Sequence, residues 1–418
     1  MKTLLGNRVF VLVMASDLLQ QIGIWIRNMA LLYFVVAQTN GDPIAVSLLT
    51  VAEYAPIFIF SIIGGVLADR WRPKRTMIIG DLLSLLSIAP ILWAVQAGYW
   101  QAVFVAAGVS AIVSQFSQPS SMKMFKRYVP DSQVGSAIAF SQTMSSLFII
   151  GGPVLGTFIY TRYGISFSLS SLLVLFALSA LCLSLLPKSE PVDRTERTSV
   201  YAEWKSGLGY VKGKRQLLVL FGLFALIALS AGLIQPLEIF LITERLQLPE
   251  ASLQWFTAVS GMGMLLGGIL AGVLSAGGHL LGKERRILLL GTLVFGAATI
   301  VEGLSLWPFL TGSMRLMTGV LLAFMQTVMA TIMLTSVEER YVGRINGLFT
   351  PLFTGFLLLG TACAGVYMHA TSLTFVFITS GLILGAASFV TLGLRSGPAL
   401  APGESVAVVP RAPGLEAE

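Results

Sequence analysis

Charged side chains inside long apolar stretches are the first candidates for chemistry. Asp17 and Arg27 lie in the stretch 8–36, and Glu53 lies in the stretch 44–68. A charge inside a bilayer costs about 2.5–3.5 kcal/mol on insertion scales unless it is paired or hydrated. A buried carboxylate that can approach or leave a cation can also gain and lose a proton. Glu53, Asp17 and Arg27 are therefore candidates for a proton-binding site, and a static ion pair that fixes helix packing is the alternative.

The spacing around the first turn indicates which of these charges can meet. The turn is centred near 39–41, and Arg27 and Glu53 each lie about a dozen residues from it on adjacent predicted helices. Because a helix rises by the same amount for each residue, the two side chains should have similar depth. We expect them to pair or to share a cavity, whereas Asp17 lies nearer the other end of its helix.

The helix 8–36 also carries a polar stripe. Asp17, Gln20, Gln21 and Asn28 follow the i, i+3, i+4 and i+11 spacing that places side chains on one helical face. Gln21 and Asn28 are candidates to line a small-molecule cavity, together with four aromatic residues elsewhere in the chain: Trp25, Phe116, Phe148 and Phe349. Packing against lipid or neighbouring helices is the alternative for each aromatic residue.

The second half of the chain repeats the pattern of a charge on each side of a turn. Glu302 and Arg315 flank the turn at Trp307–Pro308, and by the same depth argument they can pair, with a structural role as the preferred interpretation. Glu238 follows Pro236 near the end of an apolar stretch, where a solvated position and a gating position are both open. Asp81 is expected to be structural.

Composition decides which elements must hold these residues. Of all residues, 55% are hydrophobic and 11% are charged, whereas soluble domains have about 25% charged residues. The chain therefore needs lipid around it. The net charge of +7 does not indicate nucleic acid, because the cations form short clusters between apolar runs. We expect no metal site, cofactor or ATP site, and no nucleophile–base pair indicates an enzyme.

About 20 mainly apolar residues are needed for one membrane crossing. By this measure the sequence predicts an all-α membrane protein with twelve transmembrane helices and no cleaved signal peptide. The predicted helices span 8–36, 44–68, 76–96, 100–122, 134–159, 166–187, 215–240, 252–275, 287–306, 308–334, 345–367 and 373–394.

The positions of the cations orient this arrangement. Clusters of Lys and Arg precede the first predicted helix and follow the second, fourth, sixth, eighth and tenth, so all of them lie on one side. That side is expected to be cytoplasmic and to hold both termini. The opposite loops hold little beyond Arg162 and Arg245.

Polar segments divide the chain into four parts. We expect a six-helix bundle over 1–187, a cytoplasmic linker with a short amphipathic helix over 188–214, a second six-helix bundle over 215–395 and a disordered tail over 396–418. Gly64-Gly65-Val66-Leu67-Ala68 is echoed by Gly267-Gly268-Ile269-Leu270-Ala271 in the second half. A duplicated, pseudo-symmetric helical unit is typical of secondary transporters, which bind substrate between the halves.

Two motifs carry a family resemblance. The loop Gly65-x-Leu67-Ala68-Asp69-Arg70, followed by Lys74 and Arg75, resembles the loop signature of the major facilitator superfamily, and Gly152-Pro153-x-x-Gly156 resembles the signature of its drug/proton antiporters. The segments 207–211 and 341–344 resemble the branch of macrolide-efflux and enterobactin-exporter proteins. The sequence departs from these patterns at Pro73, Phe148 and Thr157, and the helix 100–122 has no embedded Arg.

The resemblance implies the fold of that superfamily and a transport function. Gly65, Asp69, Arg70, Lys74 and Arg75 would form a gating loop. The expected activity is proton-coupled export, by alternating access, of an amphipathic small molecule such as a drug, macrolide or siderophore. The expected setting is the bilayer of a bacterial inner or plasma membrane, and the expected state is a monomer. A lipid or metabolite carrier and a non-transporting sensor or scaffold are the alternatives.

Overall fold

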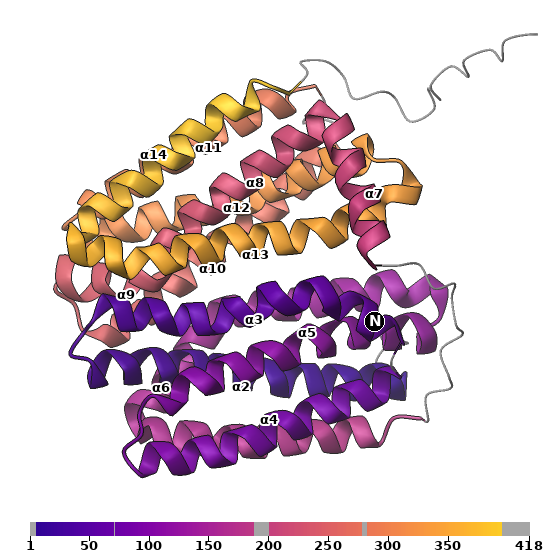
Figure 1. Cartoon of the computed structure of the whole chain (residues 1–418), viewed down its shortest axis with the longest axis vertical. Coiled ribbons are helices and arrows are strands. Elements are labelled where there is room, and N and C mark those ends of the chain that lie inside the picture. Colours follow the sequence, from indigo (N-terminus) through magenta and orange to yellow (C-terminus); the bar gives the residue numbers. More distant parts are fainter. Residues whose placement is uncertain (1–5, 71, 188–199, 278–281, 395–418) are drawn as a thin grey trace, which may run out of the picture.

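The computed structural model describes residues 6–70, 72–187, 200–277 and 282–394, and Figure 1 shows their arrangement. For a further set only the backbone is described: 62–70, 117–119, 122, 126, 131–132, 200–204, 334, 339–340, 342 and 346. The side chains of Asp69 and Arg70, and the surroundings of Gly65, therefore lie outside the described part. The predicted tail 396–418 and the linker residues 188–199 also lie outside it.

The first half of the chain is a series of long helices: α2 (Arg8–Gln38), α3 (Pro43–Arg70), α4 (Pro73–Gln96), α5 (Ala102–Tyr128) and α6 (Asp131–Ser184). The side-chain oxygen of Asn7 accepts hydrogen bonds from the backbone N–H groups of Val9 and Phe10 and so caps α2. Pro73 begins α4, where the missing N–H of proline has no helical partner to lose.

Gly164 divides the 54-residue run α6. Its backbone has φ 76° and ψ −175°, which is a left-handed conformation that favours glycine. The run therefore consists of two helices that meet at Gly164, close to where the sequence predicts a boundary between the helices 134–159 and 166–187.

The second half begins with α7 (Val200–Gly213) and α8 (Arg215–Ile234) and continues through shorter turns. The remaining elements are η1 (Gln235–Leu237), α9 (Glu238–Phe240), η2 (Leu241–Arg245), η3 (Glu250–Ser252), α10 (Leu253–Ala276), α11 (Glu284–Leu304), α12 (Pro308–Ser336), α13 (Glu339–Ala370) and α14 (Leu373–Thr391). The helix α7 lies in the segment where a short amphipathic helix is predicted.

The regular helix α8 ends at Ile234, six residues before the predicted end. Pro236 has no N–H to continue the hydrogen-bond ladder, and the chain proceeds as a 3-10 turn, a single α-helical turn and a π-helical turn up to Arg245. Gln235 and Glu238 therefore lie on an irregular segment.

The helices form two bundles that lie side by side (Figure 1). Within the first, α2 packs on α6 and α4 packs on α5; within the second, α10 packs on α12 and α11 packs on α14. The two bundles meet mainly where α3 contacts α13 and where α6 contacts α10. A hydrophobic core of buried residues continues across this boundary, from Tyr33 and Val46 to Phe240 and Phe377.

Ten of the described helices are long and apolar enough to cross a membrane. One of them is the run 133–184, which contains Gly164, and the apolar part of α5, Ala102–Phe116, is shorter than the others. The number of twelve crossings and the side on which the termini lie remain predictions.

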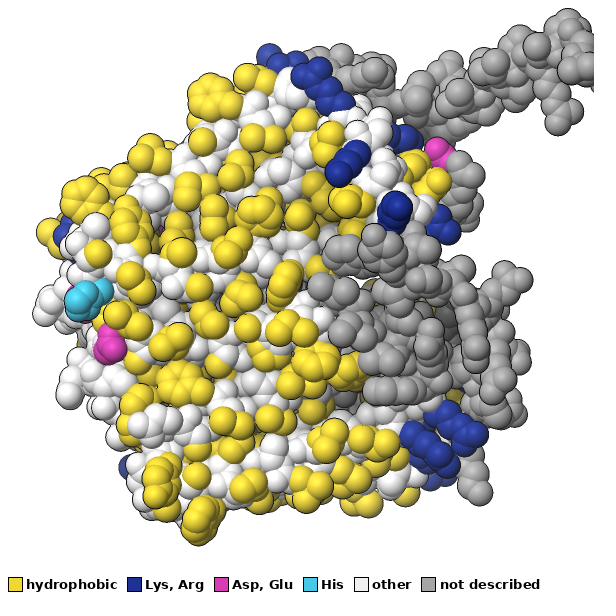
Figure 2. All heavy atoms as spheres, viewed as in Figure 1, with side chains coloured by type: hydrophobic (Ala, Val, Ile, Leu, Met, Phe, Trp, Pro, Cys, Tyr) yellow, Lys and Arg dark blue, Asp and Glu magenta, His cyan; other side chains and the backbone are white. Residues whose placement is uncertain are grey.

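Hydrophobic side chains cover most of the face shown in Figure 2, and Lys and Arg gather toward the end at which α7 lies in Figure 1. We call this the basic end; α3 and α5 end at it, and α4 and α6 begin at it. The opposite end holds the α2–α3, α8–α10 and α13–α14 connections.

Candidate functional site

The predicted pair in the first half is present. Nη2 of Arg27 lies 3.4 Å from Oε1 of Glu53, and the Arg27 side chain is buried while that of Glu53 is 30% exposed. The side-chain oxygen of Asn28 accepts hydrogen bonds from Nε (3.1 Å) and Nη2 (2.7 Å) of the same guanidinium. Asn28 therefore holds the cation even when Glu53 does not, so the ion pair can open without leaving Arg27 unsatisfied.

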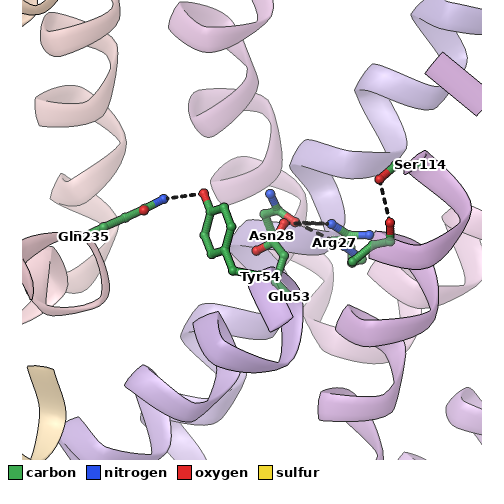
Figure 3. Close-up of polar contacts among 7 residues, drawn as sticks. Arg27, Asn28, Glu53, Tyr54, Ser114 and Gln235 are labelled. Atoms are coloured by element: carbon green, nitrogen blue, oxygen red, sulfur yellow. Dashed lines mark hydrogen bonds and ion pairs between the residues drawn. The ribbon is translucent and has the colours of Figure 1, made fainter. Parts of the chain in front are cut away.

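The residue next to Glu53 reaches the other half of the chain. Nε2 of Gln235, at the start of η1, donates a 3.0 Å hydrogen bond to the hydroxyl oxygen of Tyr54 on α3. Figure 3 shows this bond beside the cluster of Arg27, Asn28 and Glu53. Nothing local in the sequence links residues 54 and 235, and the proline after Gln235 is the signal that the helix breaks there.

The predicted pair of Glu302 and Arg315 is also present, and it has a third member. Arg315 of α12 forms ion pairs with Glu302 of α11 and with Glu238 of α9. Glu238 is thus held in an ion pair and keeps a side-chain exposure of 24%. Its position directly after a break in α8 is the signal that could have identified it.

Asp17 lies away from both charge clusters. It accepts a 3.1 Å hydrogen bond from Ser121 of α5. Ten residues separate it from Arg27, or about 15 Å along α2, so Asp17 and Glu53 cannot belong to one site. Gln20 on the same helix instead donates to Asp81.

Asp81 is the most deeply buried carboxylate of the first half whose contacts are described. It is 2% exposed and accepts hydrogen bonds from Gln20 (2.8 Å) and Ser179 (2.5 Å). These bonds join α2, α4 and α6. The arrangement agrees with the structural role expected for Asp81.

The residues of the antiporter-like motif pack directly on α2. A Cβ atom at Gly152 would lie 2.3 Å from the ring of Trp25, and one at Gly156 would lie 2.4 Å from the backbone oxygen of Trp25. Pro153 is buried between them. Trp25 is thus part of the α2–α6 interface, which is the packing alternative for this residue.

One cavity lies between the halves, with a volume of about 370 Å³. Its walls come from α6, α10 and α12 and include Ser146, Ile149, Met264, Gln326 and Thr327. None of the six predicted cavity residues lines it. Phe349 instead packs edge-on against Phe224 at 4.1 Å and Phe116 against Phe60 at 6.0 Å, while Gln21 and Phe148 are half-buried.

The described part of the predicted gating loop is tied to its own half. Nζ of Lys74 donates to the backbone oxygen atoms of Ser184, at 2.8 Å, and of Leu186. This joins the start of α4 to the end of α6. Arg75 is exposed at the basic end.

Comparisons with known proteins agree with this architecture. A family model described as Major Facilitator Superfamily matches residues 13–242, more than half of the 418 residues. The uncharacterized MFS-type transporter YfiS of Bacillus subtilis is 26% identical over 391 residues, which cover 91% of each chain. Macrolide efflux protein A of Streptococcus pyogenes is 22% identical over 385 residues, covering 86% of this chain and 89% of that protein.

A solved structure shows the same fold. The nucleoside transporter NupG superposes with a TM-score of 0.72 at 13% identity, and the match covers 92% of this chain and 99% of NupG.

Proposed function

Because the chain belongs to the Major Facilitator Superfamily, we propose that it exports an amphipathic small molecule through a bacterial plasma membrane in exchange for protons. Family membership and the ten apolar helices make it a multi-pass membrane transporter of a small molecule. Members of this family are generally not enzymes. Export, the substrate class and proton coupling are the parts of the proposal that need support.

The relatives and the distribution of charged side chains support export as the direction of transport and a bacterial plasma membrane as its location. A protein whose name states macrolide efflux matches most of the chain, and the relatives reported above are bacterial. Twelve crossings follow if α6 crosses twice around Gly164 and α5 crosses once. The gathering of Lys and Arg at the basic end supports a cytoplasmic location of that end.

The observation that carries the proposal is the Arg27–Glu53 ion pair beside the boundary between the halves. When Glu53 takes up a proton its charge is lost, and Arg27 keeps its bonds to Asn28. The change occurs next to Tyr54, whose hydroxyl is bonded to the other half. Proton uptake at Glu53 thus acts on a contact that must break when the halves separate.

The gating loop is proposed to act at the basic end. Lys74 already anchors α4 to α6, which leaves Asp69, Arg70 and Arg75 as the residues proposed to make and break contacts there. A membrane potential supplies about 2.3 kcal/mol per charge at 100 mV. By the rule of about 1.4 kcal/mol per factor of ten, this sustains a gradient of roughly fiftyfold.

Efflux from a pump-deficient bacterium tests the proposal. Cells are loaded with a fluorescent lipophilic cation or, separately, with a macrolide, with and without a protonophore. We expect the wild type to lower accumulation and the protonophore to cancel this effect. Glu53→Gln and Asp69→Asn should abolish export at equal protein levels, while Glu244→Gln, which alters an exposed carboxylate, should export normally.

The outcomes separate the alternatives. If neither compound moves, drug and macrolide export are contradicted, and export of a siderophore or lipid becomes the working function. If export persists with the protonophore, proton coupling is contradicted. If Glu53→Gln exports normally but the protonophore still acts, the coupling proton binds elsewhere and Asp17→Asn is the next variant.

A further inference from the structure

Three charged side chains meet inside the second half, and the proposed function does not use them. Nη1 of Arg315 lies 2.6 Å from Oε1 of Glu238, and its Nε contacts Oε1 of Glu302. The side chains of Arg315 and Glu302 are 7% and 5% exposed, and that of Glu238 is 24% exposed. We call these three residues the second-half cluster.

The charges of this cluster do not balance. One guanidinium faces two carboxylates, so the fully ionised cluster has a net charge of −1, with two of its three side chains buried. An unbalanced ion in a protein interior costs several kcal/mol even after relaxation. Two carboxylates that share one site relieve the repulsion when one of them takes up a proton.

Among the described residues, no second cation forms an ion pair with the cluster. Phe377 of α14 packs on Gly303, next to Glu302. Arg245 of η2 directs its guanidinium to the backbone oxygen atoms of Leu304 and Ser305. From the first half, the described titratable groups nearest to the cluster are Tyr54, whose hydroxyl accepts the hydrogen bond of Gln235, and Glu53 beside it.

The cluster is also not optimised as a static ion pair. Nη2 of Arg315 is buried and has no hydrogen-bond partner within the described residues. A buried donor without a partner costs about 1–3 kcal/mol. A purely structural triad would be expected to satisfy this group.

Glu238 lies on a less regular stretch of backbone than its two partners. Glu302 and Arg315 lie on the regular helices α11 and α12, whereas Glu238 lies on the irregular segment after α8. One turn earlier, Gln235 of the same segment bonds to Tyr54 of the first half. Glu238 and a residue that contacts the first half therefore lie on one short segment.

We propose that one of the two carboxyl groups beside Arg315, that of Glu302 or of Glu238, holds a proton while the opposite end is closed. When the halves separate and Glu238 leaves Arg315, Glu302 and Arg315 form a neutral pair, and the proton passes from the carboxyl oxygen to water. Proton uptake thus favours closure of this end. The proposal assumes the alternating access of the proposed function, but the proton site itself is a property of the folded cluster.

Infrared spectroscopy of the full chain in lipid bilayers tests the site without any substrate. We expect a protonated-carboxyl C=O band that disappears on raising the pH from mildly acidic to alkaline and shifts in deuterium oxide. Glu302→Gln and Glu238→Gln should each remove this band. Glu244→Gln, which alters an exposed carboxylate away from both clusters, should leave it unchanged.

A band that is absent from the wild type, or that survives in both folded glutamine variants, would overturn the proposal. If a glutamine variant does not fold, Glu238→Asp keeps the carboxyl group but moves it by one methylene, and the band must then change in frequency. An unchanged band in folded Glu238→Asp would count against the site. Failure of the efflux experiment leaves this measurement unaffected, so the two proposals can fail separately.

Discussion

Gln235 donates a hydrogen bond to Tyr54, and the bond joins the two halves of the chain between their buried charge clusters. Tyr54 follows Glu53, which pairs with Arg27. Gln235 precedes Glu238, which pairs with Arg315, by one helical turn. A movement that separates the halves here must therefore act on both clusters together.

Removing the Tyr54 hydroxyl should favour the state in which the opposite end is open. The net contribution of one hydrogen bond to stability is about 0.5–1.5 kcal/mol. Tyr54→Phe should therefore shift the equilibrium between the closed and open states of this end roughly two- to tenfold. Gln38 and Ala370 are exposed at this end, one in each half. Spin labels on cysteines at these two positions, in a variant whose Cys182 and Cys363 are replaced, would report the distance between the halves. An unchanged distance distribution would show that the bond does not hold the halves together.

Gly365 should be required for closure of the same end. A Cβ atom at Gly365 would lie 2.4 Å from the backbone oxygen of Pro43, so Gly365→Ala should push α13 away from α3. The expected penalty is about 1–3 kcal/mol. Gly347 lies on the same helix with open space around it, so Gly347→Ala should leave the spin-label distances at their wild-type values. Equal effects of both substitutions would contradict a role for close packing.

Neighbouring glycines of α10 should differ in their effect on stability. A Cβ atom at Gly267 would lie 2.2 Å from the backbone oxygen of Val320 on α12, whereas one at Gly268 meets nothing within 4 Å. Gly267→Ala should lower the free energy of unfolding by about 1–3 kcal/mol or more, and Gly268→Ala should not. Thermal unfolding in detergent measures both variants, and similar melting temperatures would contradict the packing of α10 on α12.

The antiporter-like motif should act through its contact with Trp25. Gly152→Ala should destabilise the protein because the new methyl group would meet the indole ring, and Gly151→Ala should not, since nothing lies within 4 Å of that position. Trp25→Leu should partly relieve the effect of Gly152→Ala, because residues in contact do not behave additively. A double-mutant cycle of melting temperatures checks this, and strict additivity would mean that the two residues act independently.

Much of the architecture could be predicted from the sequence because hydrophobicity and charge are local properties. Apolar runs and clusters of cations indicate most helices to within a few residues. The pairing of Arg27 with Glu53 and of Glu302 with Arg315 could also be predicted, since each pair flanks a single turn at similar depth. The irregular segment after Ile234 was predicted as regular helix, although Pro236 is the residue that ends it.

The contacts between the halves were decided only by the tertiary structure. Tyr54 and Gln235 are 181 residues apart in sequence, and no spacing rule predicts which faces of two separate bundles will meet. The same reason explains why the ion pair of Glu238 with Arg315 cannot be read from the sequence. The sequence by itself determined the helices, their charges and the pairs formed across single turns; the packing of the two bundles determined which of those residues lie where the halves must part.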